Sequence, residues 1–542
     1  MSDQADRLVA LALELYRVGQ SDDRIPFLVE VGGPQVAYRL ARGGHLEDRL
    51  AAGYYDREEE VPPARAIEDA VAVLKGLARR SEPTAVHLRV AKVEDSIVVD
   101  LGDAPGRVVE VDRFGWRLRE QSPVLFWRSD LTEELPLPVR GGSIDELAPL
   151  VNCDEEQFRL LVGWMVGFLH VDLQQPILAA YGYQGTAKST LVRMVVGTVD
   201  PSSAPLSSPP ASVKDWAVHA QARQLIAVDN VTKISPGLAD LWCRAVTGEA
   251  HVHRQLYTDD SLHQMTFKRA IAFTSIGAPI RGDLADRTLR VDLTRIPDDQ
   301  RQTHSELLAR FEQMRPRLFG ALLDMAAETL HYLPQVKPEK LPRMADHARV
   351  LQALDLARPG NGYFDAMMRA GERLRIETVE DDEVAAAVVK MVDKDGPWEG
   401  TATDLRQRLT PHRPPRGWPQ TAQHLSARLR NLAPGLLELG VDVQWERRGA
   451  KSIRIITIQP TPDEGPPTSS GSSGSSVSPY ENPPSAGATD DADDAYDGVE
   501  RSPRSEADGE SGLSALRTEG ESTADLLGRL AAELSMPSGE EE

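Results

Sequence analysis

The stretch PILAAYGYQGTAKSTL at residues 176–191 carries the pattern that decides the fold. It begins with an apolar run at 177–180, which is typical of a buried strand, and continues into a loop that contains two glycines. Lys188 and Ser189 follow the loop, and an apolar helical pattern starts at Leu191. A phosphate-binding loop has this order, because its backbone N–H groups and the N-terminus of its helix surround the phosphates.

The loop predicts a nucleotide site that holds ATP and Mg²⁺. We expect Lys188 to reach the outer phosphates and Ser189 to ligate Mg²⁺. The residues expected to surround the nucleotide are Gly182, Gln184, Gly185, Thr186, Ala187, Lys188, Ser189 and Thr190. Ala187 departs from the pattern G-x-x-x-x-G-K-[ST], since glycine is usual there, and its methyl group is tolerated if φ is negative. The alternative is an ordinary glycine-containing turn before a helix.

Two more apolar runs fit the same kind of domain. The run 225–228 is followed by Asp229, and a carboxylate at this place beside the first strand holds Mg²⁺ in P-loop proteins. Any buried strand can end in aspartate, so this run supports a Mg²⁺ site at Asp229 only because the predicted phosphate-binding loop precedes it. The run 270–273 leads into Thr274 and predicts a third strand.

Length and composition limit the class of protein. A chain of 542 residues is too long for a single core, so we expect several domains. Its 2 cysteines, Cys153 and Cys243, favour a reducing compartment without a disulfide framework. The N-terminus lacks a basic region before its apolar residues, and no run of about 18 apolar residues occurs. We therefore expect a cytoplasmic protein without a membrane partner.

The charge of the chain is unevenly distributed. Its formal net charge is −22. Residues 461–542 hold 19 acidic and 4 basic side chains, which is a net charge of −15. Residues 396–459 instead hold 10 Lys and Arg against 5 Asp and Glu, a local charge of +5. A basic module inside an acidic chain is compatible with DNA binding, which the total charge alone would argue against.

The basic module has the order of a winged helix. Helical patterns at 383–392, 401–409 and 419–432 precede a predicted hairpin at 441–458. In such a domain the third helix lies in a DNA groove and the hairpin contacts phosphates. The cationic residues expected to contact DNA here are Arg428, Arg430, Arg447, Arg448 and Lys451. A winged helix that binds a protein instead is the alternative, because the fold does not determine the partner.

Several stretches together resemble a known family. They are LPLPVRGGS (135–143), GYQGTAKST (182–190), AVDN (227–230), AVTGEAHVHRQLYTDD (245–260), DLADR (283–287) and LPRMADHA (341–348). Over roughly residues 86–458 the chain resembles the phage and plasmid primase–helicase type of the superfamily 3 helicases, a branch of the ring-forming AAA+ ATPases. It looks closer still to the stand-alone ATP-binding proteins of actinobacterial mobile elements.

The resemblance implies a homo-oligomeric ring, with a hexamer as the expected size, that acts on single-stranded or forked DNA. It implies that Arg254 lies on a hairpin that faces the channel of the ring and contacts DNA. Arg287 resembles the arginine finger that reaches the γ-phosphate of the neighbouring subunit. Arg281 is the next candidate for that role, and the alternative makes Arg287 a salt-bridge residue of its own chain.

Two positions depart from the family pattern. Thr274 stands at the sensor position, where asparagine is usual, and would orient the attacking water. Asn230 follows Asp229 where a catalytic glutamate is usual, and an asparagine cannot accept a proton. Hydrolysis is then slow, or Asp240 or Glu249 serves as the base. This departure favours an alternative to the ATP-hydrolysing helicase-like motor, namely an ATP-gated DNA-binding switch or scaffold. A third possibility is a defence or regulatory ATPase that docks a protein.

The resulting expectation is an α/β protein built around a P-loop AAA+ core. Its predicted parts are an N-terminal α+β domain at 1–125, the ATPase core at 126–300, a helical lid at 301–378, the C-terminal winged helix at 379–460 and a disordered acidic tail at 461–542. The tail is too polar to bury a core, although its segment 523–534 has the pattern of a helix that folds on a replication or element-encoded partner. A merely solvated tail is the alternative.

Overall fold

The computed structural model describes residues 3–461, with gaps at 41–44, 249, 255–261, 267, 281, 298, 300, 338–340, 381, 416 and 449–452. The chain is a mixed α/β protein, as the sequence predicts. Some predictions fall outside the described residues, namely those for Glu249, Arg281, Lys451 and, beyond Thr461, the acidic tail with its segment 523–534.

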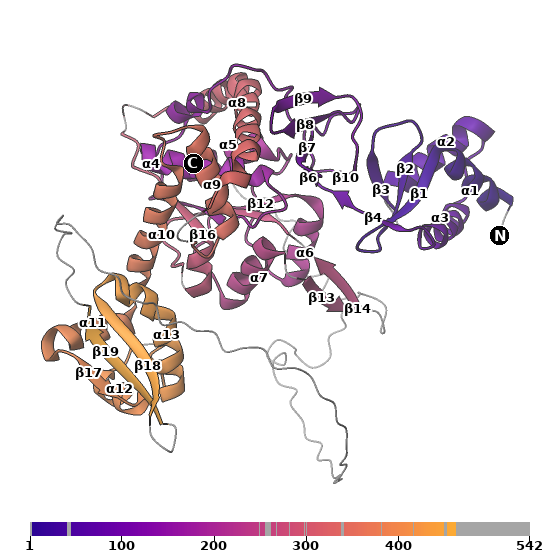
Figure 1. Cartoon of the computed structure of the whole chain (residues 1–542). Coiled ribbons are helices and arrows are strands. Elements are labelled where there is room, and N and C mark those ends of the chain that lie inside the picture. The colour runs from indigo at the N-terminus through magenta and orange to yellow at the C-terminus, as the bar shows by residue number, and fades with distance from the viewer. Residues whose placement is uncertain are drawn as a thin grey trace, which may run out of the picture. The chain divides into compact units, whose positions relative to one another are not determined.

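A six-stranded mixed sheet with three helices forms the N-terminal part (Figure 1). The strands, in spatial order, are β4 (Pro83–Thr84), β1 (Tyr16–Ser21), β2 (Pro26–Glu30), β3 (Val36–Arg39), β10 (Leu125–Trp127) and β5 (Val86–His87). The helices are α1 (Asp3–Leu15), α2 (His45–Glu58) and α3 (Ala64–Ala78). Leu8, Leu28, Tyr54 and Leu74 are buried in one cluster, so the helices cover the sheet through an apolar core of their own.

A four-stranded antiparallel sheet follows within the same region. Its strands are β6 (Val90–Val93), β7 (Ser96–Asp100), β8 (Val108–Asp112) and β9 (Gly115–Arg119), in that order. Val111 and Trp116 share a hydrophobic cluster with Leu318 and Leu322 of the long helix α8 (His304–Tyr332). The apolar core is therefore continuous across the boundary that the sequence suggests near residue 125.

The central sheet is parallel and has four strands. In spatial order they are β12 (Leu225–Val228), β15 (Ala270–Ser275), β11 (Ile177–Tyr181) and β16 (Thr288–Asp292). The register places Ala272 opposite both Leu178 and Ala227. Every residue of β11, β12 and β15 is buried, which is typical of parallel strands covered on both faces.

Alternate residues of β11 belong to two different apolar clusters. Leu178 and Ala180 pack with the face covered by α4 (Glu155–Leu169), α5 (Lys188–Val199) and α8. Ile177, Ala179 and Tyr181 pack with the other face, where α6 (Val213–Ala222) and α7 (Pro236–Thr247) contribute Trp216 and Trp242. This two-sided packing holds the carboxyl ends of the strands in fixed positions beside α5.

Helices dominate the chain after the central sheet. They are α8, which starts at a capping box of Thr303 and Glu306, then the short η4 (Leu333–Gln335), α9 (Ala345–Ala357) and α10 (Tyr363–Glu380). Phe311, Leu351 and Tyr363 belong to the same cluster as α5 and the sheet. The two 3-10 segments η1 (Ile144–Leu150) and η2 (Gly282–Arg287) complete this part.

The last described part has three helices and a three-stranded antiparallel sheet (Figure 1, orange to yellow). Its elements are α11 (Glu383–Asp395), β17 (Trp398–Gly400), α12 (Ala402–Leu409), α13 (Ala422–Glu438), β18 (Val441–Arg448) and β19 (Ile453–Pro460). The three helices and the hairpin agree with the sequence patterns, except that α13 continues past Pro434. β17 was not predicted, because its three residues are too few to show a periodicity.

Candidate functional site

The loop between β11 and α5 has the backbone that a strand–loop–helix turn requires, with Gly182 at φ +153° and Gly185 at φ +77°. Ala187 caps the N-terminus of α5 with φ +64° and ψ 26°. The condition stated from the sequence, a negative φ at Ala187, is therefore wrong. A left-handed alanine costs about 1–2 kcal/mol relative to glycine-like freedom, because its Cβ approaches the following carbonyl. Such strain is characteristic of functional loops.

Lys188 is the first residue of α5, and its side chain folds back over the loop. Its Nζ donates hydrogen bonds of 2.7 Å to the carbonyl oxygens of Gly182 and Tyr183. Partial burial lowers the pKa of Lys188, while the negative charge of Asp229 acts in the opposite direction. The ammonium group thus lies inside the loop and within the electrostatic reach of Asp229.

Asp229 accepts two hydrogen bonds on one oxygen. Ser189 Oγ donates to Asp229 Oδ1 over 2.8 Å, and Thr274 Oγ1 donates to the same oxygen over 2.6 Å. Asp229 directly follows β12, and Thr274 lies near the end of the adjacent strand β15. The fold therefore brings together three residues that are separated by 40 and 45 positions in the chain.

Asn230 takes part in the site through its backbone N–H. Its φ is +55°, and its N–H donates to Thr274 Oγ1 over 2.8 Å. The Thr274 hydroxyl, which is 1 % exposed, accepts this bond while its own proton is directed to Asp229. Asp240, the described member of the two alternative carboxylates, forms an ion pair with Arg244 on α7 over 3.0 Å.

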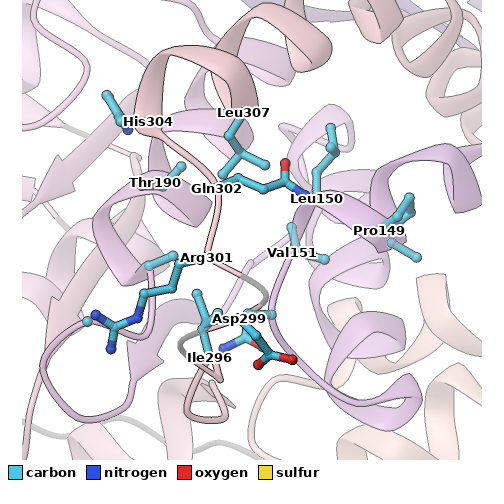
Figure 2. A pocket seen from close by; sticks show the side chains of 14 residues that line it. Pro149, Leu150, Val151, Thr190, Ile296, Asp299, Arg301, Gln302, His304 and Leu307 are labelled. Atoms are coloured by element: carbon cyan, nitrogen blue, oxygen red, sulfur yellow. The ribbon is translucent and has the colours of Figure 1, made fainter.

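A cavity of about 830 Å³ adjoins the loop (Figure 2). Gly185, Ala187 and Thr190 line one part of it. The remainder comes from two segments, 148–152 at the end of η1 and directly after it, and 296–307 before and within α8. Figure 2 shows Leu150 and Val151 on one side, and Arg301 and Thr190 on the other.

Sequence reasoning missed the residues that these two segments contribute. Asn152 and Thr294 bind each other, with Thr294 Oγ1 donating to Asn152 Oδ1 over 3.1 Å. This contact ties the segment after η1 to the segment after β16. Arg301 lies beside the loop, since a Cβ atom on Gly185 would be 3.7 Å from Arg301 Nη2. The segment 294–303 has no apolar period, so no signal in it could have assigned Arg301 to the site.

Arg287 lies in an ion pair of its own chain. It is 7 % exposed, and its Nε donates to Asp283 Oδ2 over 2.9 Å. Arg343 approaches the other oxygen of Asp283 over 3.3 Å. This is the arrangement of the salt-bridge alternative, and the action of Arg287 on a neighbouring subunit stays a prediction.

The cationic residues of the C-terminal part have different surroundings. Arg428 donates twice to Asp382 Oδ2, over 2.9 and 2.7 Å, and once to the carbonyl oxygen of Gly417. Asp382 also caps α11, so Arg428 holds two helices together. Arg428 is thus paired with a buried carboxylate of its own chain, and its contact with DNA stays a prediction that requires it to leave Asp382.

The other predicted DNA contacts lie nearer the surface. Arg430 is exposed and its guanidinium lies 5.7 Å from the ring of Trp445. Arg447 is exposed and is paired with Arg454 across the β18–β19 hairpin. Arg448 forms exposed ion pairs with Glu399 and Glu446. Arg254 ends β13 (Ala250–Arg254), which pairs with β14 (Leu262–Thr266) in an antiparallel hairpin.

Two protein-family models match the chain. The model of the actinomycete integrative conjugative element replication protein matches residues 144–373, which include the loop, Asp229, Thr274 and the cavity. The model of the RepA C-terminal domain of the same elements matches residues 384–473. Over these two ranges the chain is similar to the RepA replication proteins of these elements. The resemblance to proteins of actinobacterial mobile elements is thereby confirmed.

Solved structures similar to this chain are distant in sequence. SCCmec type IV Cch, described as an active helicase, is 12 % identical and covers 82 % of this chain and 92 % of its own, with a TM-score of 0.43. The C-terminal region of NrS-1 is 10 % identical, with coverages of 84 % and 99 % and a TM-score of 0.38. The JCV helicase is 13 % identical, with coverages of 45 % and 66 % and a TM-score of 0.21. Among curated proteins, none matches this chain.

Neither cysteine of the chain is part of a disulfide, and burial raises the pKa of both thiols to about 12. No helix in the described part of the chain is long and apolar enough to cross a membrane.

Proposed function

We propose that this protein is a RepA replication protein and an ATP-hydrolysing AAA+ motor of the helicase type that acts on DNA during replication of a mobile element. The observation that carries the proposal is the pair of hydrogen bonds from Ser189 and Thr274 to Asp229 Oδ1. These bonds join Ser189, which follows the loop lysine, to Asp229, which follows β12. They also join Asp229 to Thr274, the proposed sensor residue, on the adjacent strand β15. The match of residues 144–373 to a replication-protein family model supports the biological setting.

The oxygen donors at this point fit a magnesium ion. A hydroxyl and a carboxylate oxygen are the ligand types that Mg²⁺ prefers, with water and substrate phosphates as its other ligands. Ser189 and Asp229 would hold the ion through the two oxygens that now share a proton. When bound, Mg²⁺ neutralises charge on the β- and γ-phosphates during transfer.

The loop is suited to the phosphates of a nucleotide, and the cavity is suited to its nucleoside. The loop amides and the Lys188 ammonium would bind the phosphates, which requires Lys188 to exchange the carbonyls of Gly182 and Tyr183 for phosphate oxygens. The cavity next to Gly185 and Thr190 has the volume of a small-molecule site, and its apolar residues Leu150 and Val151 could cover a base. We assign the nucleoside to this cavity.

Hydrolysis would rest on positioning and charge. Thr274 is held between Asp229 and the N–H of Asn230, so its oxygen is fixed beside the site of transfer. Arg287 would stabilise charge from a neighbouring subunit of a ring, with a hexamer as the expected size. That role requires Arg287 to leave Asp283, and the exposed Arg343 could then keep Asp283 paired.

The C-terminal part is proposed to be a winged helix that binds DNA. Arg430, Arg447, Arg448 and Lys451 remain the proposed contacts to phosphate, together with Arg254 in the channel of the ring. The cross-strand pair of Arg447 and Arg454 supports this, because like charges opposite each other are unfavourable until an anion lies between them.

The second candidate is an ATP-gated DNA-binding switch that hydrolyses ATP slowly. It is favoured by Asn230, which cannot act as a base, and by the ion pair that engages Asp240. Asn230→Glu separates the two candidates. In a switch that lacks only the base, turnover should rise by about a hundredfold, since general bases contribute roughly that factor or more. In a motor that uses another carboxylate, Asn230→Glu should leave turnover unchanged or lower it.

A further inference from the structure

A small cationic pocket lies at the end of the parallel sheet opposite to the proposed ATP site. Its volume is about 230 Å³. Asp23, Arg39 and His87 line it from the N-terminal sheet, and Lys268 and Arg269 line it from the chain directly before β15. Thr274 of the ATP site lies five residues after Arg269 along the same buried strand, a separation of about 16 Å at the rise of a β-strand. The pocket is therefore a separate site.

Positive charge is concentrated in this pocket. Arg39, Lys268 and Arg269 line it together with His87, whereas the carboxylate among its lining residues is that of Asp23. Burial lowers the pKa of each of the four basic groups, that of Arg269 to about 10, while the charge of Asp23 acts in the opposite direction on Arg39 and Arg269. The main cost to these cations is therefore their burial, and a bound anion in the pocket would offset it.

The guanidinium groups are held in place by the surrounding fold. Arg39 donates to Gln221 Oε1 over 2.9 Å and to the Gln221 carbonyl oxygen over 3.0 Å, and it lies 4.8 Å from the centre of the Trp127 ring. Arg269 Nε donates to the carbonyl oxygen of Ala220 over 2.6 Å. Groups that are already ordered lose little conformational entropy when a ligand binds.

We propose that this pocket binds a phosphate group. Planar guanidinium groups match the oxygens of a phosphate, and a lysine adds a point charge, so two arginines and a lysine suit a multiply charged tetrahedral anion better than a single carboxylate. The volume is below that of a typical drug-sized site, which limits the ligand to phosphate, pyrophosphate or one phosphate of a longer molecule.

The position of the pocket gives it two sources of phosphate. Lys268 follows β14 of the β13–β14 hairpin by two residues, so the pocket lies at the base of the element proposed to face DNA. The phosphate could therefore belong to a DNA backbone or to a small phosphorylated compound. In either case β15 connects the pocket to Thr274. A phosphate bound in the pocket could therefore influence the ATP site at the other end of this strand.

Titration calorimetry with pyrophosphate on the full chain tests the proposal. The Lys188→Ala background removes the loop lysine, so that binding at the proposed ATP site does not obscure the result. Lys268→Gln in this background should weaken pyrophosphate binding about tenfold, the equivalent of one charge-assisted hydrogen bond. Lys394→Gln, which removes an exposed lysine of α11, is the matched control and should bind as the background does.

Two outcomes overturn the proposal: no pyrophosphate binding in the background protein, or equal binding by Lys268→Gln and Lys394→Gln. Because the background already lacks Lys188, neither outcome depends on whether the loop binds ATP. A single-stranded oligonucleotide then identifies the source. If the phosphate is that of DNA, the oligonucleotide displaces pyrophosphate and Lys268→Gln lowers the salt dependence of DNA binding by about 0.7. If it belongs to a small compound, both ligands bind together and the salt dependence is unchanged.

Discussion

Ser189 Oγ donates a hydrogen bond of 2.8 Å to Asp229 Oδ1, and through it the start of α5 is joined to the end of β12. The same oxygen accepts a hydrogen bond from Thr274 Oγ1, so helix α5 and the adjacent strands β12 and β15 converge on one carboxylate. Removing the carboxylate charge without changing its shape should separate binding from catalysis.

Ala187→Gly should stabilise the protein. The left-handed backbone at φ +64° costs alanine about 1–2 kcal/mol, while the added freedom of glycine in the unfolded chain costs about 0.5–1 kcal/mol. The net gain is of the order of 0.5 kcal/mol and should raise the midpoint of thermal unfolding slightly. Ala217→Gly in the interior of α6 is the control, and it should lower the midpoint, because glycine is unfavourable inside a helix. A decrease for both variants would contradict the argument from strain.

Arg428→Ala and Arg447→Ala should have opposite consequences. Arg428→Ala leaves the buried Asp382 carboxylate without its cation, which should cost about 2 kcal/mol of stability. Arg447 is exposed, so Arg447→Ala should preserve stability and reduce the salt slope of duplex DNA binding by about 0.9. Chemical unfolding and DNA titrations at several salt concentrations measure both effects. An unchanged slope for Arg447→Ala would remove the hairpin from the DNA interface.

Stability should fall in mild acid because of two buried histidines. Burial lowers the pKa of His170 to about 4 and that of His347 to about 3. Both remain neutral in the folded protein, whereas in the unfolded chain they take up protons below about pH 6.5. The free energy of unfolding is therefore unaffected by these histidines above about pH 6.5 and decreases as the pH falls toward 4. At pH 5 the decrease is roughly 2 kcal/mol per histidine.

His347→Leu tests this pH dependence. Neither ring nitrogen of His347 has a hydrogen-bond partner among the described residues, so an apolar side chain of similar size should be tolerated at pH 7. Thermal unfolding at pH 7 and pH 5 should show a smaller decrease for His347→Leu than for the unmodified chain. His412→Leu, at an exposed position, should leave the decrease unchanged. A similar slope in all three proteins would show that other groups determine the acid sensitivity.

Arg287→Ala and Asp283→Asn distinguish an arginine finger from a structural ion pair. If Arg287 acts on a neighbour, Arg287→Ala should be inactive, whereas Asp283→Asn, which only frees Arg287, should remain active. Mixing Lys188→Ala with Arg287→Ala should restore activity at about a quarter of the interfaces of a heterologous ring. Loss of activity in both single variants, without recovery in mixtures that exchange subunits, would assign Arg287 to its own chain.

The sequence predicted the parts of the fold that depend on local pattern. The apolar runs at 177–180, 225–228 and 270–273 lie in strands, and the apolar helical pattern after Lys188 lies in α5, as these local patterns predict. The meeting of Ser189 and Asp229 followed from the order of those elements. What could not be predicted depends on contacts between distant segments. Arg301 reaches the loop only because α8 packs beside α5, and Arg428 is neutralised by Asp382 from another helix.

The sign of φ at Ala187 was misjudged for a related reason. Alanine disfavours the left-handed region, so local preference argued for a negative φ. The loop nevertheless has to turn there to start α5 at Lys188, and the packing of α5 against the sheet outweighs the strain at one residue.

The rate of ATP hydrolysis, with and without single-stranded DNA, tests the central claim most directly. We predict that the full chain hydrolyses ATP with Mg²⁺ and that DNA accelerates the reaction. Lys188→Ala and Asp229→Asn, shown to be folded, should each lose about a hundredfold or more of this activity, whereas Lys233→Ala at an exposed position should retain it. Turnover by folded Lys188→Ala and Asp229→Asn proteins at the rate of the unmodified chain would contradict the assignment of the active site.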